Sequence, residues 1–592
     1  MMDLVPGAVD RPLKTTRYLG SYSLDIKLPV DGLKFRSNLG IDARTVQDYE
    51  FRSAETSNRG MGTSYAKNAV DKYTMFTLEN MLFYDKTFND KHTLGVTLLQ
   101  SIQEDKKENV NVAMENLPAD NLKYYDLGSG LVTNTIGSSM IKWNMASFMG
   151  RINYNYLGRY LLTVSARYDG SSRLADGHKW VLFPSAALAW RINEESFMSS
   201  TSGWLDNLKL RLGFGKTGNS AVDPYQTKGT LSLIRYPFDN GGTPTIGYAP
   251  NAMANSLLTW ETTDQWNLGI DFGVLRGRIN GTIDLYMQNT HDLLLKRQLP
   301  VVSGFPDVLS NVGKTRNKGI EVSINSMNIN SKDFQWTTDL MLSSNKEEIV
   351  ELYNGKNDDI GSKWFIGQPV NVHYDYRKVG IWQNTESDLA EMAKFAANGT
   401  EFAPGDIKIQ DVNGDYKITD ADKQILGNPR PKLIASMVNT FNYKGFDLSV
   451  FLYASFGAML YNDIYAVEHC GRNGGVKVDY WTPNNPTNAY PRPSIDEERP
   501  IYITSTYYEK ADFLRVKTMT LGYTLPKTLT NKSLVEKLRV YFTAQNPFIF
   551  TNYTGIDPEA AKVNSAGNPE TNGSGFGTPS VSSWIFGINL TL

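Results

Sequence analysis

Hydrophobic and polar residues alternate with a period of two along many stretches of this chain. The segment 584–592 is the clearest case, with Trp584, Phe586, Ile588, Leu590 and Leu592 on one face. Its other face, which begins with Ile585, is mostly polar or small. Because successive side chains of a β-strand point to opposite faces, such a strand contacts an apolar medium on one side and a polar medium on the other.

The same alternation occurs in neighbouring segments that are joined by short turns. Segments 265–274 and 279–288 are separated by a few residues around Gly277, with Leu268 and Leu285 on the predicted apolar faces. Asn280, Asp284 and Gln288 lie on the predicted polar face of the second segment. Further pairs are 143–156 with 159–171, 312–328 with 333–350, 431–443 with 446–462, and 510–526 with 537–551. We interpret each pair as an antiparallel hairpin.

The connections between the predicted strands are of two lengths. Short joints such as Leu157-Gly158 and Lys444-Gly445 alternate with long connections. The long connections are 52–70, 107–140, 218–257, 352–430, 463–509 and 553–580. Short turns at one end and long loops at the other are typical of an outer-membrane β-barrel, with the turns periplasmic and the loops extracellular. The sequence therefore predicts an all-β, antiparallel transmembrane β-barrel domain over residues 1–592.

Counting back from the C-terminal strand gives roughly 17 strands, whereas bacterial single-chain barrels use even numbers. We therefore expect that some N-terminal strands are missing and that one seam stays unpaired near 16–28 and 582–592. The first residues, Met1 to Pro6, lack the basic and apolar regions of a signal peptide, so we expect the C-terminal part of a longer precursor. In 514–525 the apolar phase shifts, which either a β-bulge or an interface crossing would explain.

Composition excludes several other classes of protein. The formal net charge is −2, so no basic surface for nucleic acid is predicted. The single cysteine, Cys470, excludes an internal disulfide. The sequence has no apolar run of about 18 residues, and therefore no predicted helical membrane span.

One segment has the spacing of a calcium-binding loop. Oxygen ligands at positions 1, 3 and 5, a backbone carbonyl at 7 and an acid at 12 suit Ca²⁺. The corresponding residues are Asp411, Asn413, Asp415, Lys417 and Asp422. Two departures weaken the match, since Tyr416 replaces the usual glycine and Asp422 is shorter than the usual glutamate. The alternative is a polar surface turn rich in Asx-turns. A structural Ca²⁺ site and a simple turn both remain open.

No other cofactor and no catalytic residue is predicted. The segment Gly213–Gly218 matches GxGxxG, but the residues after it cannot start a helix cleanly, as a nucleotide-binding loop requires. No GxSxG segment occurs, and acid pairs such as Glu194-Glu195 would alternate faces on a strand. No nucleophile, base and orienting group are arranged as an enzyme needs them.

Short motifs along nearly the whole chain resemble those of the SusC/RagA-type TonB-dependent transporters. The matching stretches, in chain order, are 159–162 with Asp169-Gly170-Ser171-Ser172-Arg173, 208–211 with Thr217-Gly218-Asn219, Trp260-Glu261-Thr262-Thr263 with 268–271, 317–321, Pro404-Gly405-Asp406 leading into 411–415, 513–516 through Leu521-Gly522-Tyr523, Gln545-Asn546-Pro547, and Tyr553-Thr554-Gly555-Ile556-Asp557-Pro558-Glu559. Each motif is weak alone, whereas their shared order is specific.

The resemblance implies the large plugged barrel of 22 strands. It implies active import of oligomeric nutrients, glycans or peptides, across the outer membrane of a Gram-negative bacterium. The implied partners are the TonB complex, a SusD-like surface lipoprotein, the substrate and outer-membrane lipid. The TonB box, the plug and the first strands of the family are not found in this sequence, so transport is expected of a full-length parent. The alternatives are a passive porin or a surface adhesin, and an outer-membrane enzyme.

Overall fold

The computed structural model describes residues 5–60, 62–236, 245–462, 477–493, 499–530, 535–559 and 579–591. Within these ranges, eighteen strands are assigned to one sheet, comprising the two-residue β1 (Val9–Asp10) and seventeen longer strands. The seventeen longer strands match the predicted number of roughly 17 strands. The chain divides into two compact units, and β9 (Leu205–Asn219), β12 (Glu261–Val274) and β13 (Ile279–His291) contribute residues to both. Among the described residues, no helix combines the length and apolar character needed to cross a membrane.

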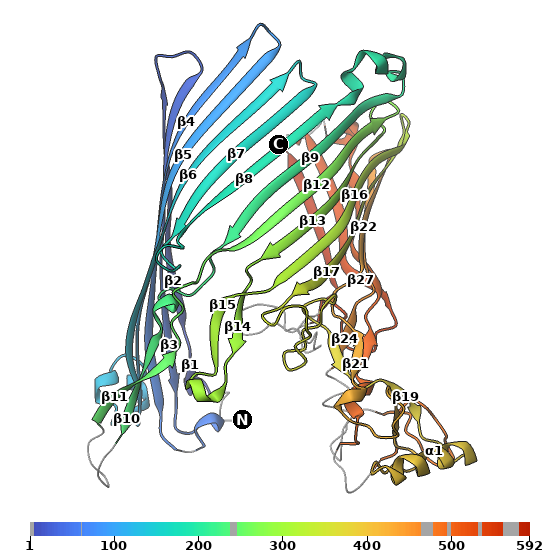
Figure 1. Cartoon of the computed structure of the whole chain (residues 1–592). Helices are drawn as coiled ribbons and strands as arrows, with labels where there is room; N and C mark the ends of the chain where they lie inside the picture. The colour runs from blue at the N-terminus through green and yellow to red at the C-terminus, as the bar shows by residue number, and fades with distance from the viewer. Residues whose placement is uncertain are drawn as a thin grey trace. The chain divides into compact units, whose positions relative to one another are not determined.

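The first unit contains residues 1–190, 212–266 and 290–313. Its main strands form an antiparallel meander in which each strand pairs with the next along the chain (Figure 1). They are β2 (Leu13–Lys27), β3 (Leu33–Arg52), β4 (Tyr65–Phe88), β5 (His92–Glu115), β6 (Val132–Tyr156), β7 (Tyr160–Ser171) and β8 (Trp180–Arg191). Two short hairpins add β10 (Thr230–Tyr236) with β11 (Thr245–Ala252), and β14 (Leu294–Gln298) with β15 (Asp307–Asn311).

The second unit contains residues 191–211, 267–289 and 314–592. Its main strands continue the same antiparallel order. They are β16 (Lys314–Asn330), β17 (Phe334–Glu351), β22 (Leu433–Tyr443), β23 (Phe446–Phe456), β26 (Phe513–Thr524), β27 (Lys537–Thr551) and β28 (Ser583–Thr591). A short helix, α3 (Lys527–Thr530), follows β26. The four hairpins predicted in 143–171, 312–350, 431–462 and 510–551 are confirmed.

The tight turns use left-handed backbone, as two-residue hairpins require. Leu157 and Gly158, between β6 and β7, have φ of 54° and 70°. Lys444 and Gly445, between β22 and β23, have φ of 46° and 90°. Glycine adopts these angles without a steric penalty, which explains its place in both turns.

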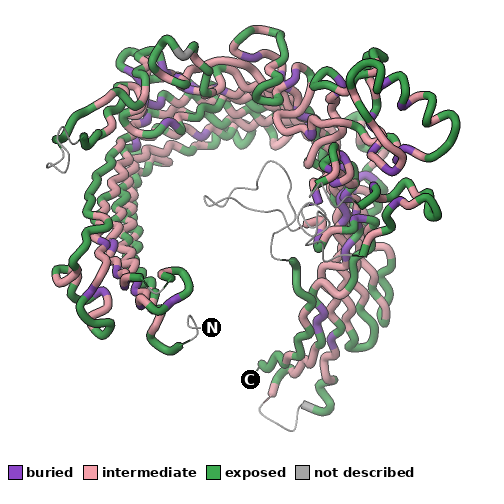
Figure 2. The backbone as a smooth tube through the Cα atoms, turned by 90° about the horizontal axis from the view of Figure 1, so that it is seen from below, coloured by how far each residue is buried: buried purple, intermediate pink, exposed green. Residues whose placement is uncertain are grey.

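Many large apolar side chains on the described strands are exposed. Figure 2 shows that the long strands are mostly exposed or of intermediate burial, with buried residues at intervals. Trp584, Phe586, Ile588 and Leu590 of β28 are exposed, as are Leu268 and Leu285, in agreement with the predicted apolar faces, and Ile585 on the other face of β28 is exposed as well. Leu592 lies outside the described residues. Asp271 and Asp284 on the opposite face bind Arg211, with Arg211 Nε 2.9 Å from Asp271 Oδ1.

The predicted connection 107–140 is wrong, because strands occupy most of it. β4 and β5 each contain 24 residues and β6 contains 25, whereas about 10 residues suffice to cross a membrane. The sequence predicts a loop at the polar ends of these strands because apolar and polar residues do not alternate there. They are held by the backbone ladder and by ion pairs, such as Lys142 Nζ to Glu104 at 2.9 Å.

The phase shift predicted in 514–525 results from a β-bulge. The register of β26 shifts between Val516 and Thr518 relative to β27, and the matching shift relative to β23 lies between Phe451 and Leu452. Relative to β23, Lys517 is therefore the extra residue of β26, and the following side chains change faces. Relative to β27, the extra residue lies in β27, at Asn546 or Pro547.

The connection between β17 and β22, together with residues near 480–510, folds into a loop unit with its own core. Its elements are β18 (His373–Asp375), β19 (Lys378–Ile381), α1 (Glu386–Ala397), β20 (Ile407–Ile409), β21 (Gln424–Gly427), β24 (Met459–Tyr461) and β25 (Tyr508–Lys510) (Figure 1). Two apolar clusters fill it, Ile381, Ile407, Ile409, Trp481, Ile503 and Tyr507, and Trp382, Met392 and Phe395. These buried side chains show that the described residues of the loop unit pack around cores of their own.

Candidate functional site

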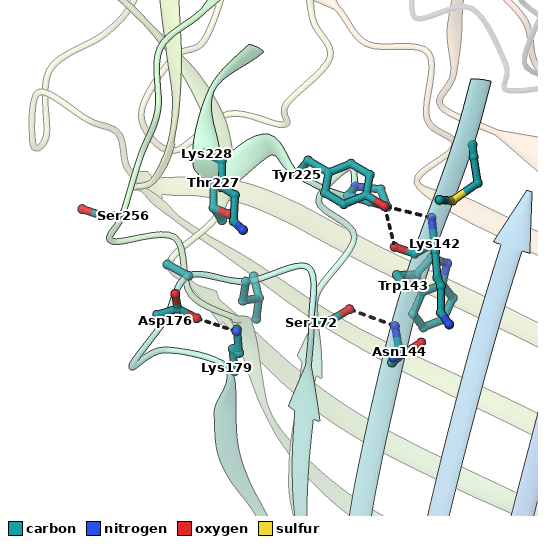
Figure 3. A pocket seen from close by; sticks show the side chains of 14 residues that line it. Lys142, Trp143, Asn144, Ser172, Asp176, Lys179, Tyr225, Thr227, Lys228 and Ser256 are labelled. Carbon is teal, nitrogen blue, oxygen red and sulfur yellow. Dashed lines mark hydrogen bonds and ion pairs between the residues drawn. The ribbon is translucent and has the colours of Figure 1, made fainter. Parts of the chain in front are cut away.

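A pocket of about 550 Å³ lies in the first unit, next to β6 and the connection between β7 and β8 (Figure 3). Its lining comes from four parts of the chain: residues 140–144 on β6, residues 172–179, residues 224–228 and Ser256. A volume of this size lies within the usual range for small-molecule sites, about 300–1,000 Å³.

The floor of this pocket adjoins an apolar cluster through Leu174, which belongs to both. Leu174, Val222, Leu258 and Trp260 are buried together with Phe183. Trp260 also donates from its indole Nε1 to the backbone oxygen of Lys179 at 2.8 Å, which fixes the end of the 172–179 segment. The floor therefore rests on side chains from three separate connections, and its geometry depends on their packing.

The walls of the pocket carry lysines and two aromatic rings. Lys142 pairs with Glu104, and Lys179 Nζ lies 2.5 Å from Asp176 Oδ1. The hydrogen bond from Lys179 lowers the pKa of Asp176, which keeps that carboxylate ionised. Lys228 has no ion pair within the described ranges, and its side chain completes the cationic lining.

Both aromatic rings are held in place by identifiable contacts. The guanidinium of Arg173 lies 4.0 Å from the centre of the Trp143 ring, a cation–π contact. Tyr225 hydroxyl lies 3.3 Å from both the backbone nitrogen and the backbone oxygen of Lys142 (Figure 3). Tyr225 has φ of 72°, which is unusual for a side chain of this size and indicates a position imposed by its surroundings.

The sequence did not predict this pocket. Its residues are spread over more than a hundred positions, and 140–144 were assigned to a loop end and the start of a strand. Ser172 of the motif Asp169–Arg173 lines the pocket, but the sequence indicates this motif only as part of the family resemblance. No local spacing relates Lys142, Lys179 and Lys228, so the signal exists only in three dimensions.

The predicted calcium loop is a set of Asx-turns between β20 and β21. Asp411 accepts hydrogen bonds from the backbone nitrogens of Gly414 and Tyr416, each at 2.8 Å. Asn413 Oδ1 accepts from Asp415 nitrogen at 3.0 Å, and Asp415 Oδ1 accepts from Lys417 nitrogen at 2.8 Å.

The last acid of this segment is buried. Asp422 caps the short helical turn Asp420–Asp422 and accepts from the backbone nitrogens of Val412 and Thr419. Tyr416 adopts the left-handed conformation, with φ of 60°, that glycine usually supplies at this position. Within the described ranges no group of three or more His, Cys, Asp or Glu is placed to hold a metal ion. The turn alternative explains this geometry, and Ca²⁺ binding stays a prediction.

Two other sequence features are also placed. Gly213–Gly218 lies inside β9, so it does not form the strand-to-helix loop of a nucleotide site. Glu194 pairs with Arg191 at 2.8 Å, as expected for a surface charge. Cys470 lies outside the described residues.

The loop unit of the second half is fastened by one charged cluster. Lys408 of β20 lies 4.0 Å from the centre of the Trp382 ring, and its Nζ contacts Asp388 and Glu391 of α1 at 3.1 and 2.5 Å. Thr385 caps α1 by accepting from the backbone nitrogen of Asp388. Helix α1 is thus fixed to the aromatic core beneath it.

Comparison with known proteins identifies the family. The family model "TonB dependent receptor-like, beta-barrel" matches residues 6–547. TonB-dependent receptor P3 of Formosa agariphila is 32% identical over 95% of this chain, and TonB-dependent receptor SusC of Bacteroides thetaiotaomicron is 35% identical over 70% of it. The chain spans 56% of the first and 41% of the second. The solved structure of the RagAB peptide transporter shares the fold, with a TM-score of 0.83 at 22% identity, over 98% of this chain and 62% of that one.

These matches agree with the alternating strands and the large connections. Members of this family are outer-membrane proteins of Gram-negative bacteria, and the outer membrane is therefore the location of this chain. The chain belongs to the family of TonB-dependent receptor β-barrels.

Proposed function

We propose that the full-length receptor containing this chain imports an oligomeric nutrient, a glycan or a peptide, across the outer membrane. The energy comes from the TonB complex, and a SusD-like lipoprotein binds the extracellular loops. The match of residues 6–547 to the receptor barrel carries this proposal. Because the chain spans 56% of one curated relative and 41% of another, the activity is assigned to the whole receptor.

The loop unit of the second half supports a role in partner binding. Loops of this length are uncommon unless they have a function. This one presents apolar side chains to solvent above a packed core, including Ile360, Val379 and Val412. Such side chains offer the contact area that a protein partner needs. We propose that 352–430 and 463–509 form most of the docking surface, together with 218–257 and 553–580.

The named relatives support active transport more than the alternatives. One relative is a SusC receptor, and the RagAB structure is that of a peptide transporter. A passive porin has no need of a connection with its own aromatic core. We propose no catalytic role, because the sequence shows no nucleophile, base and orienting group arranged as an enzyme needs them.

A deletion of 470–500 in the full-length receptor tests this proposal. The deletion removes Trp481, whose indole Nε1 donates to Gln383 at 2.8 Å within the loop core. The expected result is loss of lipoprotein binding and of nutrient uptake, while the barrel still inserts and remains heat-modifiable. Lys444→Ala, in a two-residue turn, is the control and should leave both unchanged. Uptake at the parental rate in the deletion variant would refute the docking surface.

A further inference from the structure

We propose that the pocket beside β6 binds an acidic saccharide unit, a pyranose that carries a carboxylate or a sulfate. This inference rests on the proposed function, since it makes the imported oligomer an anionic glycan. The site consists of Lys142, Lys179 and Lys228 with the rings of Trp143 and Tyr225 (Figure 3).

The lining has an excess of positive charge. Three lysines face one carboxylate, Asp176, and the Lys179 hydrogen bond keeps that carboxylate ionised. Glu104 offsets Lys142 from outside the lining, which leaves Lys228 as a cation without an ion pair in the described ranges. An anionic ligand would therefore meet at Lys228 a cation that no carboxylate of the described ranges pairs with.

Arg173 adds to this potential from behind Trp143. Its Nε is buried and has no hydrogen-bond partner within the described residues. Burial lowers the pKa of Arg173, although the charges of Asp105 and Asp223 oppose that shift. A bound anion nearby would act in the same direction as these two carboxylates and would not need to displace the guanidinium from the Trp143 ring.

The two rings supply flat apolar surfaces of the kind that pack against the C–H face of a sugar. Tyr225 is 46% exposed, and its hydroxyl is fixed by the Lys142 backbone, so the ring is presented in one orientation. Arg173 lies over the ring of Trp143, which is partly exposed and lines the pocket. Rigid aromatic surfaces of this kind cost little entropy on binding.

Neutral polar groups complete the lining. Asn144, Ser172, Thr227 and Ser256 surround the lysines (Figure 3). Their amide and hydroxyl groups both donate and accept, which matches the hydroxyls of a sugar ring. The apolar floor is closed by Leu174 and Ala175, so the pocket offers no deep apolar slot for a large peptide side chain. These features favour a saccharide over an acidic peptide.

Titration calorimetry of the full-length receptor in detergent tests the proposal with four probes. They are tetragalacturonate, its methyl-esterified form, a sulfated galactan tetrasaccharide and a tetraglutamate peptide. We expect the carboxylated or the sulfated tetrasaccharide to bind more tightly than the ester, with an affinity that falls as salt rises. Comparing the two acidic sugars identifies which anion is preferred. Equal binding of acid and ester, or binding of the peptide alone, would overturn the inference.

Two variants locate the binding in this pocket. Lys228→Gln should lower the affinity for the acidic sugar by about 1.5- to 5-fold, as for an exposed charge pair, and leave the affinity for the ester unchanged. Tyr225→Ala should lower the affinity for both sugars. Lys296→Gln, at an exposed lysine of β14, is the matched control and should change neither. An unchanged affinity in Lys228→Gln and Tyr225→Ala would place the binding elsewhere and refute the site.

The same proteins separate this inference from the function on which it rests. Uptake that persists without TonB would refute active import, while selective binding of the acid would still support the pocket. TonB-dependent uptake with no preference for acidic sugars would support active import and refute the acidic-sugar site.

Discussion

Replacing Arg515 with methionine should release the last long connection of the chain. Arg515, in β26, is 4% exposed, and its guanidinium lies 2.5 Å from Asp557 and 2.6 Å from Glu559. Asp557 also accepts from the backbone nitrogens of Glu559 and Ser580. One buried carboxylate therefore holds the beginning and the end of the 553–580 connection against the sheet.

The expected cost follows from the burial of Asp557, which is also 4% exposed. Removing one partner of a buried ion pair costs about 3–5 kcal/mol, because the remaining charge stays buried without compensation. Because about 1.4 kcal/mol corresponds to a factor of ten, amide exchange in 553–559 should accelerate by roughly 10²- to 10⁴-fold. Hydrogen exchange measured by mass spectrometry on the full-length receptor in detergent reports this directly.

Lys517→Ala is the matched control for this prediction. Lys517 binds Glu559 at 2.7 Å from the same strand, but both side chains are partly exposed, so the expected change is at most about tenfold. The double variant Arg515→Met with Asp557→Asn should recover much of the protection, because it leaves no unpaired charge at Asp557. Unchanged amide exchange in Arg515→Met would show that the ion pair of Arg515 with Asp557 does not hold the 553–580 connection against the sheet.

The remaining predictions concern pH, the membrane face and the calcium loop. Burial alone would raise the pKa of Asp557, but backbone hydrogen bonds from Glu559 and Ser580 and the charge of Arg515 bring this pKa below its usual value. The ionised Asp557 therefore contributes its full stabilisation above a pH of about 4 and loses it at lower pH. Amide exchange in 553–559 should accelerate below this pH but not at pH 6. Leu268→Arg should disfavour insertion by about 2–4 kcal/mol if near the midplane, and Asn280→Arg much less; equal losses in lipid refolding would show that the faces are assigned wrongly. Ca²⁺ titration of the full-length receptor should give weak heats that Asp411→Ala with Asp415→Ala removes, whereas equal heats in both proteins would exclude the site.

The sheet was predictable from the sequence because its side chains obey a local rule. A period of two identifies strands such as β12, β13 and β28 wherever one face meets lipid. The rule fails beyond the membrane, where the polar ends of β5 and β6 are held by the ladder and by ion pairs such as Lys142 to Glu104. The phase shift in β26 was visible, but only the register at Lys517 identifies it as a bulge.

The candidate sites were less predictable. The spacing of Asp411, Asn413 and Asp415 correctly indicated a turn. The spacing could not decide whether their side-chain oxygens bind an ion or accept hydrogen bonds from backbone nitrogens. The loop core joins Trp382 to Phe395 and, in a second cluster, Ile381 to Trp481, so no window of sequence contains it. The pocket beside β6 is lined by Lys142 of β6 together with Lys179 and Lys228 of two separate connections. Local patterns cannot reveal such sites, because they arise from packing between distant segments.

Uptake with and without TonB tests the central claim most directly. Cells that produce the full-length receptor and its lipoprotein would be given labelled oligogalacturonate, a labelled neutral oligosaccharide and a labelled oligopeptide, in otherwise identical strains with intact or deleted TonB. Receptor-dependent uptake of an oligomer that disappears on deletion of TonB is the predicted result. Receptor-dependent uptake at the same rate in both strains would contradict active import and favour a passive porin.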